Sequence, residues 1–360
     1  NYWYSLIEPP STSEFPGTGP TGNGISERYQ SQAAWVDNMK QGCQLCHQLG
    51  NQATRVVQHR TDFDSAVDAW DHRVQTGQRG NQMSGFMDRF GRQRALAMFA
   101  DWTERIAAGE IPPAPPRPQG LERNVVVTLW DWGTETDGRT DSAASDVRDA
   151  TVNANGLVYG VVQPSDILAV LDPVAHQATN ITIPSDAPPI LARTPTSPYY
   201  GDEPIWARRS DPRSVAMDGL GRVWLTGRVR APEDQPAFCT DSSNAFADYF
   251  PLDRGTRQAF VYNPDTEGFG EIDTCFSADH NQLGEDERFY YGFRDGVGWI
   301  DTEIWDESSD SEEAQGWCPT VLDTNGDGVG DACQDTDQDG VSDADGLPRL
   351  RGETTRSMTL

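Results

Sequence analysis

Apolar residues recur at every third or fourth position in three segments of the first third of the chain, with polar residues between them. The segments span residues 33–39, 63–74 and 96–106, and a glycine follows each of them three residues later. This spacing places the apolar side chains on one face of a helix, and glycine commonly ends a helix. The pattern therefore predicts three helices in a small helical domain over residues 29–110.

Segments rich in proline and glycine flank this domain. Residues 1–28 hold eight such residues between Pro9 and Gly24, which predicts an extended arm or linker. The stretch Ile111–Gly120 reads IPPAPPRPQG, and its prolines exclude both a helix and a central strand. We interpret residues 111–122 as a stiff linker of the polyproline type.

The pattern changes to short apolar runs after this linker, with Gly, Asp and Asn turns between them as far as residue 310. The run Asn124–Trp132 predicts the first strand. A weak repeat follows, in which a polar turn and an apolar strand come before an Asx-Pro pair. Its copies are Asn153–Gly160 with Asp172-Pro173, Met217–Gly227 with Asn263-Pro264, and the degraded pair Phe289–Phe293 and Val297–Ile300.

Each copy predicts a hairpin followed by an outer strand that ends in the Asx-Pro turn, as in a propeller blade. An ordinary β-sandwich is the alternative. Roughly 185 residues at about 40–45 residues per blade give about four blades, which fits a closed ring or a truncated ring that a partner completes. The predicted fold class is α+β and multidomain: a small helical domain followed by a propeller-like all-β domain over residues 123–310.

The net charge of the chain argues against some classes of binding partner. Asp and Glu number 56 against 28 Lys and Arg, which gives a formal net charge of −28. Such an acidic surface argues against nucleic-acid binding and against docking on anionic lipid. No apolar run reaches the ~20 residues of a membrane helix, so we expect no membrane insertion. The chain begins at Asn1, as expected for a processed chain or a piece of a longer one.

The strongest chemical signal is Cys43-Gln44-Leu45-Cys46-His47. The C-x-x-C-H spacing lets both thiols bond to the vinyl groups of a haem, while the histidine binds the iron. The alternatives are a redox dithiol and half of a zinc site. A dithiol motif would adjoin a βαβ pattern, and a zinc site would need a second Cys or His pair nearby. We therefore predict one covalent haem c in a cytochrome c-like domain.

The sequence offers several candidates for the sixth ligand of the iron. Met83 is the first candidate, because it follows glycines and is expected on a loop after a helix. Met87 is the reserve, and a histidine ligand would give a lower reduction potential. The other candidates in this domain are Met39, Met98, His59 and His72, of which Met98 shares an apolar stripe and is predicted to belong to the core.

Two acidic loops near the end of the chain repeat at a spacing of twelve residues. Oxygen ligands at loop positions 1, 3, 5, 7 and 9, with glycine at 6, match a calcium loop. The predicted ligands are Asp323, Asn325, Asp327, Val329 and Asp331 in one loop, and Asp335, Asp337, Asp339, Val341 and Asp343 in the other. Position 12 lacks its usual Glu, and the tandem resembles thrombospondin type 3 repeats. We assign residues 311–346 to calcium loops and 347–360 to a tail; an acidic solvated tail is the alternative.

Four cysteines lie outside the haem motif, namely Cys239, Cys275, Cys318 and Cys333. Haem of this type is attached outside the cytoplasm, so an even number predicts two disulfides. The pairs Cys239–Cys275 and Cys318–Cys333 would each clip a local segment, but four cysteines allow three pairings. The predicted location is periplasmic or extracellular.

Taken together, these features resemble a family of large bacterial secreted proteins that join one c-type haem domain to a propeller like that of streptogramin (virginiamycin B) lyases. The resemblance covers residues 10–330 and is most specific around the haem motif. It rests on Gly42–Gly50, Phe99–Trp102, Arg117–Asn124, Asp131-Trp132, Asp172-Pro173, and Gly316–Pro319 before Leu322–Asp327. Members of the family continue with further blades, often with a carboxypeptidase-regulatory-like domain in front. The lyase resemblance implies fold alone, because His176 and His280 match no part of the lyase site.

We expect a secreted, calcium-stabilised haem protein that transfers single electrons to a redox partner or a neighbouring haem subunit. One alternative is an oxidoreductase with a substrate site in the propeller. Another is a calcium-dependent structural subunit that forms a homo-oligomer or filament through exposed strand edges. The sequence shows no catalytic constellation that would favour the enzyme.

Overall fold

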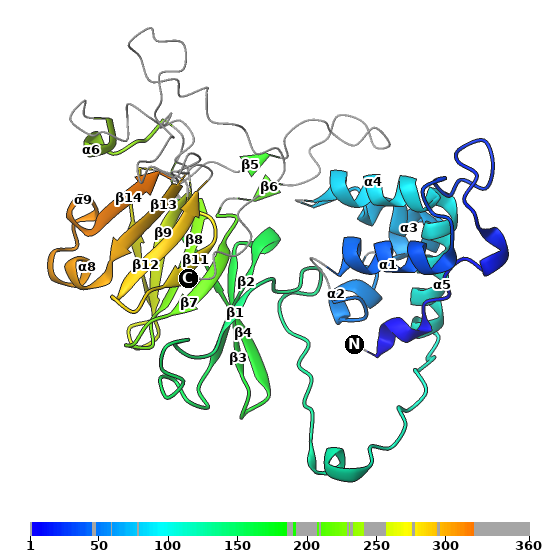
Figure 1. The fold of residues 1–360 in the computed structure, drawn as a ribbon, viewed down its shortest axis with the longest axis horizontal. Coiled ribbons are helices and arrows are strands. Elements are labelled where there is room, and N and C mark those ends of the chain that lie inside the picture. The colour runs from blue at the N-terminus through cyan, green and yellow to red at the C-terminus, as the bar shows by residue number, and fades with distance from the viewer. Residues whose placement is uncertain are drawn as a thin grey trace, which may run out of the picture.

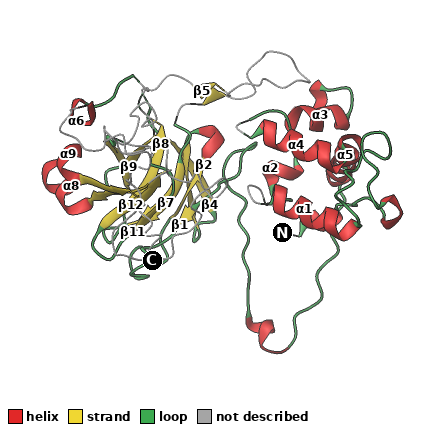
Figure 2. Ribbon diagram, turned by 45° about the horizontal axis from the view of Figure 1, so that its top comes forward, coloured by secondary structure: helices red, strands yellow, loops and turns green. Residues whose placement is uncertain are grey.

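The computed structural model describes residues 2–44, 48–58, 60–77, 79–185, 190–191, 207–208, 210–228, 230, 233–240, 257–275, 278–293 and 296–319. Helices gather in the first third of the chain and antiparallel sheets in the rest, so the fold is mixed α+β (Figure 1). Figure 2 shows the helical unit and the strand-rich unit side by side, joined by an extended connection.

Five α-helices form the helical unit. They are α1 (Gln32–Cys43), α2 (Gln52–Arg55), α3 (Ala66–Arg73), α4 (Gly80–Phe90) and α5 (Arg92–Ala107). The three predicted helices are confirmed as α1, α3 and α5. The side chain of Ser31 accepts a hydrogen bond from Ala34 N at the start of α1, and Ser65 does the same for Asp68 N at the start of α3. These caps fix where the apolar periodicity becomes a helix.

Tryptophan side chains centre the core of this unit. Trp35 and Trp102 are fully buried, and each indole still donates a hydrogen bond, to Phe90 O and Trp3 O respectively, both at 3.1 Å. Burying the indole ring stabilises the fold through its large apolar area, and the hydrogen bond leaves no buried N–H without an acceptor. Trp102 thereby ties the chain start to α5.

The first 28 residues pack on the helices instead of forming a separate linker. Leu6, Ile7 and Ile25 are buried in the same core as Trp35. Two short 3-10 turns, Trp3–Leu6 and Thr12–Glu14, break the otherwise extended path. Proline and glycine therefore set the local conformation as predicted, while three apolar side chains decide where the segment lies.

Three four-stranded antiparallel sheets form the strand-rich unit. Blade 1 contains β1 (Ser142–Ala143), β2 (Val158–Val162), β3 (Ile167–Asp172) and β4 (Gln177–Thr182). Blade 2 contains β7 (Arg213–Met217), β8 (Val223–Arg228), β9 (Arg257–Asn263) and β10 (Gly268–Ile272). Blade 3 contains β11 (Asn281–Leu283), β12 (Arg288–Phe293), β13 (Gly296–Asp301) and β14 (Gln315–Pro319). A two-stranded sheet pairs β5 (Ile190–Leu191) with β6 (Ala207–Arg208).

The blades stack side by side, with β7 in contact with both β1 and β11. One apolar core lies between blades 1 and 2 and includes Val161, Leu168 and Phe260. A second core lies between blades 2 and 3 and includes Trp224 and Phe289, whose ring centroids are 5.2 Å apart. The described residues form three propeller-like blades where the residue count suggested four.

Two details of the strand pattern differ from the prediction. The Asx-Pro turns join the third and fourth strands of a blade, and do not end the outer strand: Asp172 Oδ1 accepts hydrogen bonds from Val174 N and Ala175 N, both at 2.8 Å. The run Asn124–Trp132 is not a strand. A 3-10 turn covers Gly120–Asn124, and the extended residues that follow pair with no strand among the described residues.

Residues 130–139 bridge the helical unit and blade 1. On the helical side, Asp131 Oδ2 accepts hydrogen bonds from Arg55 Nη1 at 2.8 Å and from Gln52 N, at the first turn of α2. On the blade side, Asn180 of β4 donates to Gly133 O at 3.1 Å. Ser165 Oγ, between β2 and β3, donates to Asp137 Oδ2 at 2.6 Å. This bridging segment holds the two units against each other.

Candidate functional site

The first half of the C-x-x-C-H motif lies at the C-terminal end of α1. Cys43 is the last residue of the helix and is half-buried against the helical core. Gln44 ends the helix, donating its N–H to Lys40 O at 2.8 Å. Leu45, Cys46 and His47 lie outside the described residues. The end of α1 therefore places Cys43, the first of the two cysteines predicted to bond to the haem, at a partly exposed apolar surface.

Helix α4 packs against α1 next to the motif. A Cβ atom added to Gly42 would lie 2.7 Å from Phe86 Cε1, so the absence of a side chain at this position permits the close approach. Met83 lies one turn before Phe86 on α4, and it belongs with Cys43 to the half-buried rim of the helical core. The predicted sixth ligand thus sits on the helix that faces the motif, not on a loop.

The other ligand candidates have different surroundings. Met39, Met87 and Met98 are all buried in the core, which confirms the prediction for Met98. His72, in the last turn of α3, packs against Phe63 with the two rings tilted by 39° and their centroids 5.1 Å apart. His59 lies outside the described residues. Among the methionines of this unit, Met83 is the half-buried one, and it packs against the same core as Cys43.

Two of the side chains that were predicted to hold a haem are described, namely the thiol of Cys43 and the thioether of Met83 on the neighbouring helix. Both are of the chemical type that such a group requires. The side chains of Cys43, Met83 and Phe86 are all half-buried and pack against the same core. No signal in the sequence indicated the contact between Gly42 and Phe86, because α1 and α4 are far apart along the chain.

The predicted calcium ligands of both loops, from Asp323 to Asp343, lie outside the described residues. Within the part of the chain that the structure describes, no cluster of three or more His, Cys, Asp or Glu side chains is arranged to hold a metal ion. The disulfide Cys239–Cys275 is confirmed. Cys333 also lies outside the described residues, so its pairing with Cys318 stays a prediction.

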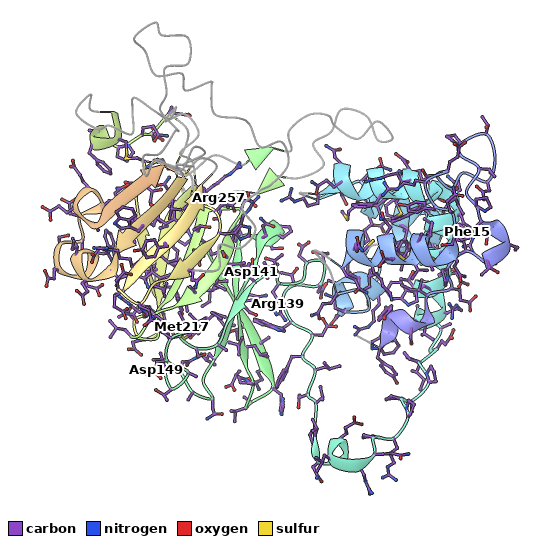
Figure 3. All side chains as sticks on the ribbon, viewed as in Figure 1. Phe15, Arg139, Asp141, Asp149, Met217 and Arg257 are labelled. Atoms are coloured by element: carbon purple, nitrogen blue, oxygen red, sulfur yellow. A yellow bond between two sulfur atoms is a disulfide. The ribbon has the colours of Figure 1, made fainter. Side chains whose placement is uncertain are left out.

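A buried charge cluster at one end of blade 2 was not expected from the sequence. Asp211, which is 2% exposed, accepts a hydrogen bond from Arg257 Nη2 at 2.5 Å, and Arg213 and Arg228 lie within 4 Å of the same carboxylate. Burial lowers the pKa of Arg257 to about 10, against the opposing effect of Asp211. Figure 3 places Arg257 at the end of the blade opposite Met217. Arginines so far apart in sequence give no signal that could have identified this cluster.

A second buried ion pair, Asp146–Arg148, lies in blade 1, and Arg148 also reaches blade 3. Arg148, between β1 and β2, donates to Asp146 Oδ2 at 2.6 Å and lies 2.8 Å from Glu287 Oε1 in the β11–β12 turn. It also donates to Gly284 O. Burial alone would raise the pKa of Asp146, but the hydrogen bonds from Arg148 outweigh it and lower that pKa.

Replacing Asp146 with asparagine should lower the free energy of unfolding by roughly 1.5–3 kcal/mol at neutral pH, since it removes a buried hydrogen bond between charged groups. The lowered pKa of Asp146 means that this contribution is present above the unfolded-state pKa of about 3.8 and is lost as the pH falls through the folded-state pKa. Urea unfolding of the wild type and Asp146→Asn across acidic pH should therefore show converging stabilities. The control Glu285→Gln, in an exposed position, should change little; a difference that persists at low pH would contradict this account.

Comparisons with known proteins give structural neighbours but no family. No protein-family model matches the chain, and no curated protein matches it. Virginiamycin B lyase from Staphylococcus aureus is similar at 10% identity and a TM-score of 0.30, over 56% of this chain and 47% of the lyase. A streptogramin B lyase structure is similar at 12% identity and a TM-score of 0.21, over 48% of this chain and 53% of the other.

A luciferin-regenerating enzyme is also similar, at 14% identity and a TM-score of 0.21, over 47% of this chain and 57% of the enzyme. This chain thus spans about half the length of the solved structures it resembles. The lyase neighbours are β-propeller folds, and the similarity concerns the fold alone. Among the described residues, no helix is both long and apolar enough to cross a membrane.

Proposed function

We propose that this chain is a c-type haem protein that transfers single electrons. The observation that carries the proposal is the C-x-x-C-H motif at the end of α1, with Cys43 half-buried beside the helix that bears Met83. A covalently held haem would supply reversible one-electron chemistry at its iron. The residues of this chain would hold it in place and set its potential.

Each residue has a defined part in this proposal. Cys43 and Cys46 would tether the macrocycle, and His47 would bind the iron. Met83 on α4 would be the second protein ligand, and a His/Met pair favours a high reduction potential. Phe86, half-buried on the same helix, would add apolar surface to the site, which favours the less charged, reduced state.

The setting of this haem is proposed to be outside the cytoplasm. Attachment of haem c and the disulfide Cys239–Cys275 both suit an oxidising compartment. The net charge of −28 favours a basic redox partner. Calcium bound by the loops from Asp323 to Asp343 would offset part of this negative charge.

The proposal is tested by the visible spectrum of the purified full chain in its oxidised and reduced forms. We expect a low-spin c-type spectrum, with a sulfur-to-iron band in the oxidised form. Met83→Leu should abolish that band and lower the reduction potential while the haem stays attached. Met98→Leu, a matched change in the buried core, should leave the band unchanged. A chain without covalent haem would overturn the proposed function, and loss of the band in Met87→Leu instead would move the ligand to that residue.

A further inference from the structure

The segment Val125–Trp130 is apolar at five of its six positions and is exposed to solvent. Val125 is 64% exposed, Val126 90%, Val127 74% and Leu129 77%. The backbone is already extended where the segment starts, with φ −98° and ψ 127° at Val125. Figure 1 shows it on the open connection between α5 and blade 1.

This composition is that of a strand covered on both faces. Consecutive β-branched and large apolar residues, without alternation, are typical of strands inside a sheet that is buried on both sides. Exposed apolar surface of this extent marks an interaction site in a folded protein. The backbone N–H and C=O groups of such a segment find hydrogen-bond partners most directly at the open edge of another sheet.

Blade 1 offers an edge of matching character that pairs with no further strand in the part of the chain that the structure describes. Strand β4 is the last strand of its sheet, and all six of its residues, Gln177–Thr182, are uncharged. Gln177, Ala178, Thr179 and Asn180 are exposed. Natural sheets protect such edges with charged residues, proline or a covering element. The outer strand of blade 2 follows that rule, since β10 contains Glu271 and has Trp305 3.7 Å from the Cβ position of Gly270.

The apolar segment and the open edge lie on the same flank of the molecule. Trp130 Nε1 donates to His176 Nδ1 at 3.1 Å, and His176 directly precedes β4. From Trp130 the chain continues into the bridging segment, where Gly133 contacts Asn180, so Val125–Leu129 project beyond the start of β4. The segment therefore points away from its own β4. It still lies close enough to that strand for a second molecule to contact both the apolar segment and the edge of β4.

Charge favours a second copy as the partner. Residues 111–130 contain Arg117 and Arg123 against one acid, Glu122, which gives +1 within a chain of −28. Repulsion between two copies is weakest where one presents this segment, and its arginines attract the acidic surface of the other. An arrangement in which each molecule gives and receives a strand is also the self-complementary contact of a two-fold dimer.

We propose that Val125–Trp130 adds as a fifth strand to β4 of a second copy, and that two copies exchange these strands reciprocally. The contact buries the exposed valines and Leu129 between the two molecules and pairs the open edge of β4. It does not depend on the haem function, because neither element contains a proposed haem ligand.

The test is the mass of the full-length protein in solution, measured by sedimentation equilibrium over a wide concentration range with and without calcium. We expect a mass twice that of the chain for the wild type. Leu129→Asp should halve the mass, because it places a charge in the donor strand. Leu220→Asp is the matched control, since Leu220 is 74% exposed in the β7–β8 turn and should leave the dimer intact.

A second variant tests the acceptor. Thr179→Lys places a protecting lysine on β4 and should also give a monomer, while an equal mixture of Leu129→Asp and Thr179→Lys should recover dimers through the one intact donor and the one intact edge. Both variants change exposed residues, and circular dichroism should confirm that each is folded. A monomeric wild type, or a Leu129→Asp protein that stays dimeric, would overturn the proposal. Dimers that disappear only on calcium removal would assign the contact to the acidic loops instead.

Discussion

Replacement of Cys43 and Cys46 by alanine should abolish covalent haem completely. Both thioether bonds disappear with the two sulfur atoms, and the remaining imidazole of His47 holds a macrocycle only by coordination. The measurement is haem staining after denaturing electrophoresis, compared with the visible spectrum of the native protein. We expect no stain at the mass of the chain and at most a weakly held, extractable pigment.

The matched control removes the other cysteine pair that the structure shows, Cys239 and Cys275. This double alanine variant loses stability with its disulfide but should stain like the wild type. Haem that survives denaturation in the Cys43→Ala/Cys46→Ala protein would contradict the assignment. A wild type that never stains would instead leave the motif as a dithiol.

Asp211→Asn should cost about 3–5 kcal/mol in the free energy of unfolding, the largest effect on stability that we expect for a single substitution. Its carboxylate is buried with the side chain of Arg257, which is 3% exposed. Neutralising one partner of such a pair leaves the other charge buried without compensation. Urea unfolding at neutral pH measures this difference directly.

Two further variants separate this effect from a general loss of charge. Asp279→Asn removes a carboxylate that is 41% exposed and contacts Arg213, so it should cost no more than about 1 kcal/mol. Asp211→Asn combined with Arg257→Met removes both buried charges and should recover much of the lost stability. Equal costs for Asp211→Asn and Asp279→Asn would show that burial at Asp211 is not what matters.

Local patterns predicted those parts of the fold that depend on local structure. The apolar periodicity and the glycine after each apolar segment located α1, α3 and α5. The periodicity did not predict α4, because Gly80 and Gly85 weaken the helical pattern. Packing of α4 on α1 compensates for the low helix propensity of these glycines. The run Val125–Trp130 has every intrinsic preference of a strand, but strand formation also needs a partner strand, which sequence preference does not specify.

The residues discussed as candidate sites also fall into local and non-local groups. Cys43, Cys46 and His47 are recognisable because their chemistry depends on positions adjacent in sequence. The cluster around Asp211 joins residues from Asp211 to Arg257, and any one of these arginines looks like a surface residue in the sequence. The pairing of Cys239 with Cys275 was one of three arrangements until the fold brought them together.

The bridging segment also determines whether a further blade can pack on the first one to close a ring. In a closed propeller the first and last blades meet, so the outward face of the first blade must be available. In this protein that face is occupied: a Cβ atom on Gly160 of β2 would lie 3.0 Å from Trp132 Cη2, and Arg139 stacks over the same indole. Asp131 continues from there to α2. The helical unit therefore stands at the seam where a ring would close, and the three described blades are sealed at this end of their arc.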